Sequence, residues 1–263
     1  MSSTQRVRKP PRQKRLLHIV DDRGEGSAII LIHGIASSSL TFTHLLPLLA
    51  GHHRVITIDL LGFGQSADGV SYTIDEHVAW LENTIRSLHL LEPATIIGHS
   101  LGGLLMARYA RRNPRRVDRL IMVNPPIILD ADDIGDRRER MAVQAFVRTY
   151  QYLRHNKAFT LRNFGMVARL LPIKGSLVVS EEDWEPFIGT MQHCIESQTT
   201  INDIGAVNSP VDIVYSSTDA LVVASGLRLV RRFRHVETHR LTGGDHLIGK
   251  RLARLVATVV DAG

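Results

Sequence analysis

The chain has 263 residues, of which 44% are hydrophobic, and its formal net charge is +6. This length and composition indicate one large domain or one domain with an insertion, and they argue against two independent domains. No apolar run reaches the roughly 18 residues that a membrane span requires, and the basic N-terminus lacks the apolar segment of a secretory signal. We therefore expect a soluble, cytoplasmic protein without a transmembrane segment.

The excess positive charge is concentrated in residues 1–15. This segment contains six basic residues and no acidic residue, and the rest of the chain has equal numbers of the two. The stretch RVRKPPRQKR also contains two adjacent prolines, which is typical of a disordered tail. We expect a solvated tail that makes at most weak contact with anionic surfaces, and no nucleic-acid partner.

Apolar runs with strand character alternate with helix-like segments along the chain. Several of these runs are continuous, as in strands that are buried on both faces of a parallel sheet. The pattern predicts an α/β fold with a mostly parallel, doubly wound sheet. The expected strands cover residues 16–20, 28–32, 54–58, 94–97, 120–123, 211–215 and 236–241. The expected helices cover residues 75–91, with Asp75 as the N-cap, 101–112, 221–232 and 247–260.

The alternation breaks between residues 125 and 205. Three segments in this stretch have helical character, and none reads as a convincing strand. We expect residues 125–205 to form a helical cap over the carboxyl edge of the sheet, where such folds bind ligands. Residues 16–124 and 206–263 would then form the α/β core.

The segment GHSLGG places Ser100 between an expected strand and an expected helix. Small residues two positions before and two positions after the serine allow neighbouring backbone to pass close to a sharp turn. Such a turn lifts the hydroxyl above the sheet, where a base can reach its proton. The alternative is a tight glycine turn with a capping serine. The context and the later partners favour Ser100 as a nucleophile.

Candidate partners follow in the required chain order. Asp219 lies on the loop after the expected strand in VDIVYSSTDALV and is suited to orient an imidazole. The alternative is a capping role for the helix that begins near Leu221, and the two roles are not exclusive. Asp203 and Asp212 are weaker candidates for this role. His246, in LTGGDHLIGK, follows the last expected strand and two glycines, at the expected start of the final helix. We expect the His99 side chain to project away from Ser100.

Two backbone amides are candidates for an oxyanion site. The Leu101 amide lies at the start of the helix that follows Ser100, and the Ile35 amide follows the turn His33-Gly34 after an expected strand. Together they would receive the negative charge that develops when a carbonyl is attacked.

These motifs resemble those of the α/β-hydrolase fold superfamily, in its lipase and esterase branch with a helical cap. The resemblance rests on HGIASS, DLLGFGQS, GHSLGG, STD and GGDH, which span nearly the whole body of the chain in the family's order. It implies a Ser100, Asp219 and His246 triad, a structural role for the loop at Asp59 and no cofactor. Epoxide hydrolases and haloalkane dehalogenases also resemble the chain, but they place an aspartate where Ser100 stands.

The function that we expect is hydrolysis of carboxylic esters through an acyl-enzyme on Ser100. The alternatives are a carbon-carbon bond hydrolase acting on ring-fission dienones, other acyl-transfer activities such as thioester or lactone cleavage, and a ligand receptor on a hydrolase scaffold. The partner would be a small-molecule ester, and the protein a monomer or homodimer. We expect no metal, and Cys194 as an apolar filler. Residues expected to line the substrate pocket, or else to pack the cap, are His33, Phe146, Tyr150, Phe164, Met166, Trp184, Phe187 and Leu221.

Overall fold

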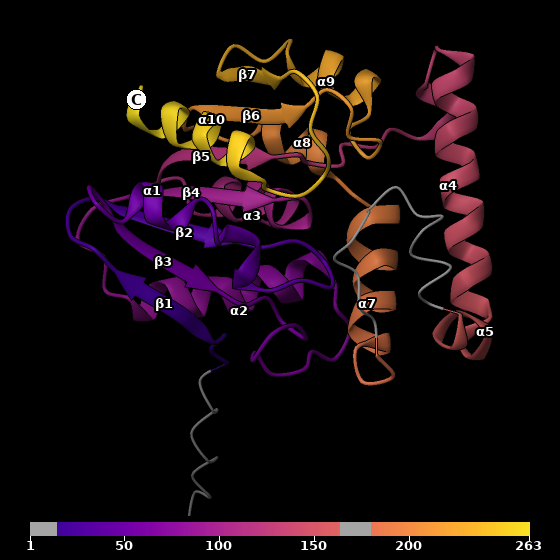
Figure 1. Ribbon diagram of the computed structural model, residues 1–263, viewed down its shortest axis with the longest axis horizontal. Coiled ribbons are helices and arrows are strands. Elements are labelled where there is room, and N and C mark those ends of the chain that lie inside the picture. The colour runs from indigo at the N-terminus through magenta and orange to yellow at the C-terminus, as the bar shows by residue number, and fades with distance from the viewer. Residues whose placement is uncertain (1–14, 164–179) are drawn as a thin grey trace, which may run out of the picture.

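A computed structural model describes residues 15–163 and 180–263 of the protein and contains a seven-stranded sheet (Figure 1). The strand order is β1-β3-β2-β4-β5-β6-β7. Only β1 runs antiparallel to its neighbour, whereas the other pairs are parallel. The predicted α/β fold class is therefore confirmed. The strands are β1 (Ile19–Arg23), β2 (Ala28–Ile32), β3 (Arg54–Ile58), β4 (Ala94–His99), β5 (Val117–Val123), β6 (Val211–Ser216) and β7 (Val236–Leu241).

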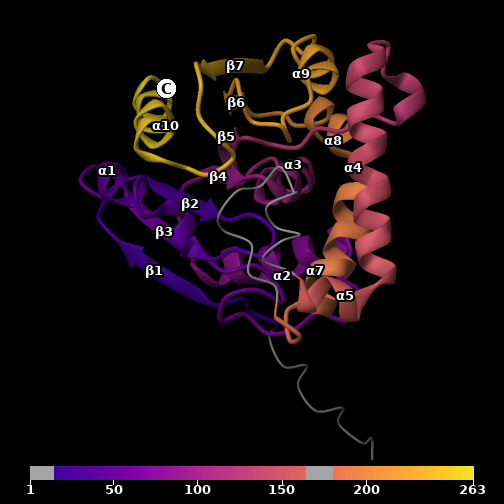
Figure 2. The ribbon, with the colours of Figure 1, turned by 45° about the vertical axis from the view of Figure 1, so that its right-hand side comes forward.

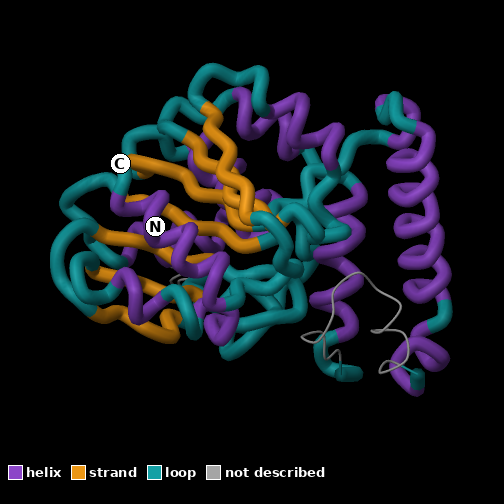
Figure 3. The backbone as a smooth tube through the Cα atoms, turned by 45° about the horizontal axis from the view of Figure 1, so that its top comes forward, coloured by secondary structure: helices purple, strands orange, loops and turns teal. Residues whose placement is uncertain are grey.

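The continuous apolar strands are explained by burial on both faces of the sheet. In β2, Ile30 and Ile32 belong to the apolar cluster under α2 and α3, whereas Ile29 and Leu31 belong to the cluster under α1 and α10. Successive strand residues point to opposite faces, so a strand covered on both sides needs apolar residues throughout. Figure 3 shows the strands as one sheet with helices on both sides.

Four helices of the core lie close to their predicted places: α2 (Ile74–Ser87), α3 (Leu101–Arg112), α9 (Ala224–Val230) and α10 (Lys250–Asp261). Two short helices, η1 (Ser39–Phe42) and α1 (Leu46–Leu49), were not predicted. The prediction of Asp75 as N-cap of α2 is wrong. Thr73 is the N-cap, and its hydroxyl accepts a hydrogen bond from the amide of Glu76. Asp75 lies inside the first turn, and its carboxylate pairs with Arg108 and Arg112.

Between β5 and β6, the described residues form helices and no strand. The helices are η2 (Ala131–Asp133), α4 (Arg137–His155), α5 (Lys157–Arg162), α7 (Trp184–Thr190), the π-helix η3 (Met191–Glu196) and α8 (Thr200–Gly205). In Figures 1 and 2, α4 and α7 lie beyond the arrowheads of the parallel strands, at the carboxyl edge of the sheet. That 125–205 acts as a cap remains a prediction. None of the described helices combines the length and apolarity needed to cross a bilayer.

Candidate active site

Ser100 occupies the sharp turn between β4 and α3. Its backbone has φ +53° and ψ −121°, a conformation that L-residues adopt only when the surrounding structure enforces it. Two glycines make the turn sterically feasible. A Cβ on Gly98 would lie 2.5 Å from the backbone of Gly102, and a Cβ on Gly102 would lie 2.3 Å from the carbonyl oxygen of Ile32. The GHSLGG pattern is thus explained by close backbone contact at the turn.

The structure brings the three predicted catalytic side chains together. The Ser100 Oγ lies 2.9 Å from Nε2 of His246, and Nδ1 of His246 lies 2.8 Å from Oδ2 of Asp219. All three residues are buried. Since an ionised carboxylate only accepts hydrogen bonds, Nδ1 of His246 carries the proton and Nε2 presents a lone pair to the serine. This arrangement suits removal of the hydroxyl proton.

Asp219 and His246 reach the triad from irregular segments. Asp219 follows β6, and its second carboxylate oxygen accepts a hydrogen bond of 2.9 Å from the amide of Leu221. His246 lies between β7 and α10, so the prediction that it begins the final helix is wrong, since α10 starts at Lys250. Gly243 and Gly244 precede it with φ of +75° and +89°. Positive φ is readily adopted by glycine, which explains why the chain turns there.

The amides of Ile35 and Leu101 remain the candidate oxyanion donors. Within residues 15–163 and 180–263, neither amide donates a hydrogen bond to a protein acceptor. Leu101 is the first residue of α3, where backbone N–H groups have no acceptor inside the helix and carry partial positive charge. Gly34 brings the other loop close to the nucleophile, because a Cβ there would lie 3.1 Å from Cβ of Ser100.

His33 lies behind the loop that carries the Ile35 amide, and its place in the substrate pocket stays a prediction. Its side chain is fully buried, and both ring nitrogens are engaged. Nε2 accepts a hydrogen bond from the amide of Leu60, so Nδ1 donates to the carbonyl of Gly34. Burial lowers the pKa of His33, which keeps the ring neutral. His33 therefore supports the turn that positions the Ile35 amide.

Two residues near the triad were missed by the sequence reasoning. His99, whose side chain was expected to project away from Ser100, packs its ring 4.9 Å from that of His246 and donates a hydrogen bond to the backbone carbonyl of His246 through Nε2. Burial lowers the pKa of His99 to about 3, so its ring is neutral. Asn124 donates to the same carbonyl. The only sequence signal for Asn124 is its position at the end of a strand, before two prolines.

The other predicted pocket residues are divided among several environments. Phe146 lines two cavities, of about 660 and 680 Å3, and the first of these also contains Tyr150 whereas the second contains Leu221. The Tyr150 hydroxyl donates to the carbonyl of Ile188, and burial raises its pKa. Trp184 and Phe187 belong to the large apolar cluster of the core, as expected for packing residues. Phe164 and Met166 lie outside the described residues.

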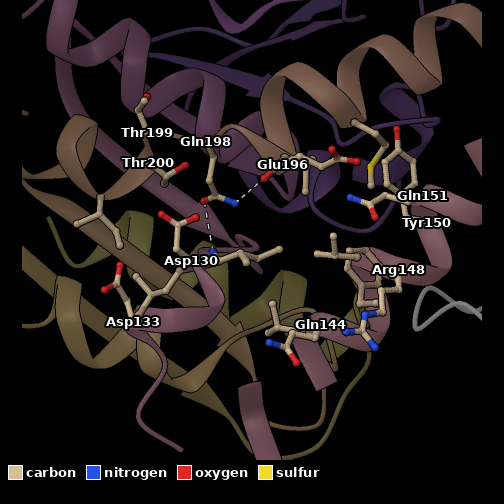
Figure 4. A pocket seen from close by; sticks show the side chains of 18 of the residues that line it. Asp130, Asp133, Gln144, Arg148, Tyr150, Gln151, Glu196, Gln198, Thr199 and Thr200 are labelled. Carbon is tan, nitrogen blue, oxygen red and sulfur yellow. Dashed lines mark hydrogen bonds between the residues drawn. The ribbon is translucent and has the colours of Figure 1, made fainter. Parts of the chain in front are cut away.

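The 660 Å3 cavity lies between α4 and the η3–α8 segment, and both polar and apolar side chains line it; the labelled polar ones are seen in Figure 4. Gln198 lines this cavity. Its side chain accepts a hydrogen bond from the amide of Ile128 and donates one to the carbonyl of Ile195. A third cavity has a volume of about 740 Å3. Its walls include Ala36, next to Ile35, and both sequence neighbours of His246, Asp245 and Leu247, but none of the side chains of Ser100, Asp219 and His246.

One group of side chains has the composition of a metal site. Asp212, Glu237 and His239 place ligand atoms within 4.8 Å of one another. However, Oδ2 of Asp212 accepts a hydrogen bond of 2.6 Å from Arg119, and its Oδ1 lies 2.6 Å from Nε2 of His239. Because an arginine already neutralises this carboxylate, we assign the group to an ion-pair cluster between β6 and β7. Asp212 therefore contacts Arg119 and His239, whereas Asp219 is the carboxylate that contacts His246.

Comparisons with known protein sequences find relatives of several activities. An uncharacterized protein of Mycobacterium tuberculosis is 40% identical over 102 residues, which are 38% of this chain and 30% of that protein. A 2-hydroxy-6-oxo-6-(2'-aminophenyl)hexa-2,4-dienoic acid hydrolase of Metapseudomonas resinovorans is 25% identical over 213 residues, covering 76% of this chain and 71% of the relative. The chain spans only about a third of the length of the first relatives that it matches, such as the Mycobacterium tuberculosis protein.

Solved structures and family models agree on the fold. A serine hydrolase involved in carbazole degradation covers 92% of both chains with a TM-score of 0.68 at 20% identity. A haloalkane dehalogenase from Agrobacterium tumefaciens covers 92% of this chain and 90% of its own, with a TM-score of 0.71 at 20% identity. A family model described as the alpha/beta hydrolase fold matches residues 27–249. The chain therefore belongs to the alpha/beta hydrolase fold family.

Proposed function

We propose that this protein is a serine hydrolase that cleaves carboxylic esters through an acyl-enzyme on Ser100. The observation that supports it is the unbroken hydrogen-bond chain from Oγ of Ser100 through both ring nitrogens of His246 to the carboxylate of Asp219. A hydroxyl is a weak nucleophile at neutral pH, and this chain provides the base that activates it.

The reaction would proceed in two halves. Oγ of Ser100 attacks the acyl carbon while its proton passes to Nε2 of His246, and the amides of Ile35 and Leu101 receive the oxyanion. Asp219 holds the imidazole through Nδ1–H and stabilises its positive charge. The ester C–O bond then breaks, and the leaving alcohol takes the proton from Nε2. Water attacks the acyl-enzyme with the same proton transfers and releases the acid.

A second candidate is carbon-carbon bond hydrolysis of ring-fission dienones. It is favoured by the similarity to the dienoic acid hydrolase of Metapseudomonas resinovorans, which extends over 71% of that relative. Dehalogenation is less well supported, because Ser100 stands where the dehalogenases that this chain resembles carry a nucleophilic aspartate. A ligand receptor on the same scaffold would not need the complete proton-transfer chain.

The experiment is a panel of short-chain to long-chain chromogenic esters, run beside a ring-fission dienone. We expect repeated turnover of esters by the unmodified protein and a loss of about 10⁴-fold or more in kcat for Ser100→Ala. Ser27→Ala, on the surface beside β2, is the matched control and should retain full activity. Faster turnover of the dienone would favour the second candidate, and stoichiometric release of product would favour a receptor. A fluorophosphonate that labels the Ser100→Ala variant would contradict the proposed nucleophile.

A further inference from the structure

We propose that Asn124 is a positioning residue for the triad, and that it fixes the segment carrying His246 to the strands that carry Ser100 and Asp219. This inference rests on the proposed function, because it concerns the base of the proposed reaction. Asn124 is fully buried and follows β5 at the carboxyl edge of the sheet.

The backbone at Asn124 lies between the strand of the nucleophile and the strand of the acid. The carbonyl of Val123 accepts a hydrogen bond of 2.9 Å from the amide of Ser100, and the amide of Asn124 donates one of 2.8 Å to the carbonyl of Val214 in β6. Asn124 has φ +47°, which asparagine tolerates better than most residues. This turn of the backbone ends the strand and directs the side chain toward the loop of the base.

The Asn124 side chain then connects the acid segment to the base segment. Oδ1 accepts a hydrogen bond of 2.8 Å from the amide of Ser216, three residues before Asp219. Nδ2 donates to the carbonyls of Asp245, at 3.1 Å, and His246, at 3.0 Å. One amide group therefore contacts the segments of two triad members, while the adjacent peptide contacts the third.

His99 provides a second donor to the backbone carbonyl oxygen of His246. Its Nε2 lies 2.8 Å from the carbonyl oxygen of His246, which leaves both lone pairs of that oxygen occupied. Because His99 adjoins the nucleophile in sequence, this contact ties the base directly to the turn of Ser100. A carbonyl oxygen only accepts hydrogen bonds, so Nε2 of the His99 ring carries the proton in this contact.

The need for these contacts follows from the irregular segment that carries His246. The base lies in neither a helix nor a strand, and two glycines with positive φ precede it. A segment with this much backbone freedom does not hold an imidazole in place by itself. Displacement of a catalytic group by about 1 Å can cost about 100-fold in rate, so side-chain donors to the backbone at His246 matter for catalysis.

The test uses the isosteric variant Asn124→Asp in the full-length protein. The carboxylate still accepts from Ser216 and tolerates the positive φ, but it no longer donates to the two carbonyls. We expect kcat to fall by about 100-fold with KM changed less than about twofold. Asn156→Asp is the matched control, since its Nδ2 also donates to a backbone carbonyl, that of Tyr152 in α4. This control should retain the activity and thermal stability of the unmodified protein.

A second measurement reports the base without any substrate. The Nδ1 proton between His246 and Asp219 is expected to give a low-field proton resonance, and we expect Asn124→Asp to broaden or shift it while Ser100→Ala leaves it in place. If the ester panel shows no turnover, the proposed function is rejected, but the low-field resonance still tests whether Asn124 positions His246. A well-folded Asn124→Asp variant with unchanged kcat, or with an unchanged resonance, would overturn the inference.

The His99 variants test the same carbonyl and stay informative even where Asn124→Asp does not fold. His99→Gln retains a donor at about the position of Nε2, whereas His99→Ala removes it. We expect His99→Ala to lower kcat and perturb the low-field resonance, and His99→Gln to restore both in large part. Equal behaviour of the two variants would contradict a positioning role for this hydrogen bond.

Discussion

Ser100 and His246 are separated by 146 residues in the chain, yet Oγ of the first lies 2.9 Å from Nε2 of the second. Each residue belongs to a segment of unusual backbone, a strained turn for the serine and a glycine-rich loop for the histidine. The proximity results from the parallel sheet, because the carboxyl ends of β4 and β7 reach the same edge.

Removing the charge of the proposed acid should abolish most activity. For Asp219→Asn we expect kcat to fall by about 10⁴-fold, because the amide no longer fixes the useful tautomer of His246 or stabilises its positive charge. Asp245→Asn is the control, since Asp245 is exposed and precedes the base in sequence. Steady-state ester kinetics measure both variants. Comparable losses in the two would show that the assignment of the acid is incorrect.

The glycine two residues after Ser100 should tolerate no side chain. A Cβ at position 102 would lie 2.3 Å from the carbonyl oxygen of Ile32, so Gly102→Ala must move backbone. Overpacking typically costs about 1–3 kcal/mol of unfolding free energy, and the displaced turn should also lower kcat. Gly135→Ala is the control, because nothing lies within 4 Å of its added Cβ. Urea unfolding and ester turnover provide the measurements, and a stable, active Gly102→Ala variant would refute the steric argument.

Stability should fall on acidification because buried histidines resist protonation. Burial lowers the pKa of His77 to about 4 and that of His99 to about 3, from an ordinary value of 6.5. Below pH 6.5 the unfolded chain binds protons that the folded protein does not. The free energy of unfolding should then decrease by up to about 1.4 kcal/mol per pH unit for each such histidine, until the pH reaches its folded-state pKa.

Urea unfolding between pH 7.5 and pH 4.5 tests this dependence. We expect His77→Gln to reduce the slope of the unfolding free energy with pH by up to about 1.4 kcal/mol per unit, since the variant lacks one titrating group. His44→Gln, at an exposed site, should leave the slope unchanged. An identical slope in His77→Gln would mean that His77 is not held neutral by the fold.

The ion-pair cluster of Asp203 should contribute to stability more than to catalysis. The Asp203 carboxylate is buried, and it accepts hydrogen bonds from Arg108 at 2.8 Å and Arg111 at 2.9 Å. Asp203→Ala removes the shared acceptor of both arginines, although Arg108 keeps its ion pair with Asp75, and breaking a buried pair typically costs up to about 3–5 kcal/mol. At a temperature where the variant is folded, kcat should stay within about tenfold of the unmodified value. A selective loss of kcat without loss of stability would place Asp203 in the reaction.

The secondary structure and the triad were predictable because their signals are local. Continuous apolar runs such as 28–32 and 54–58 predict strands of a parallel sheet, and both strands have these bounds in the structure. Ser100 was recognisable because its turn requires glycines at fixed positions, 98 and 102. Asp219 and His246 were recognisable because each follows a strand, in the chain order that the α/β hydrolase scaffold requires.

The sequence alone thus determined the sheet, the family and the residues proposed for chemistry, since periodicity and glycine spacing are properties of short segments. The tertiary structure decided the roles of His33, His99 and Asn124, whose hydrogen bonds join segments far apart in the chain. It also showed that Asp203 and Asp212 contact arginines, whereas Asp219 contacts His246. No local pattern distinguishes these residues, because burial and hydrogen-bond partners arise only when distant strands and loops meet at one edge of the sheet.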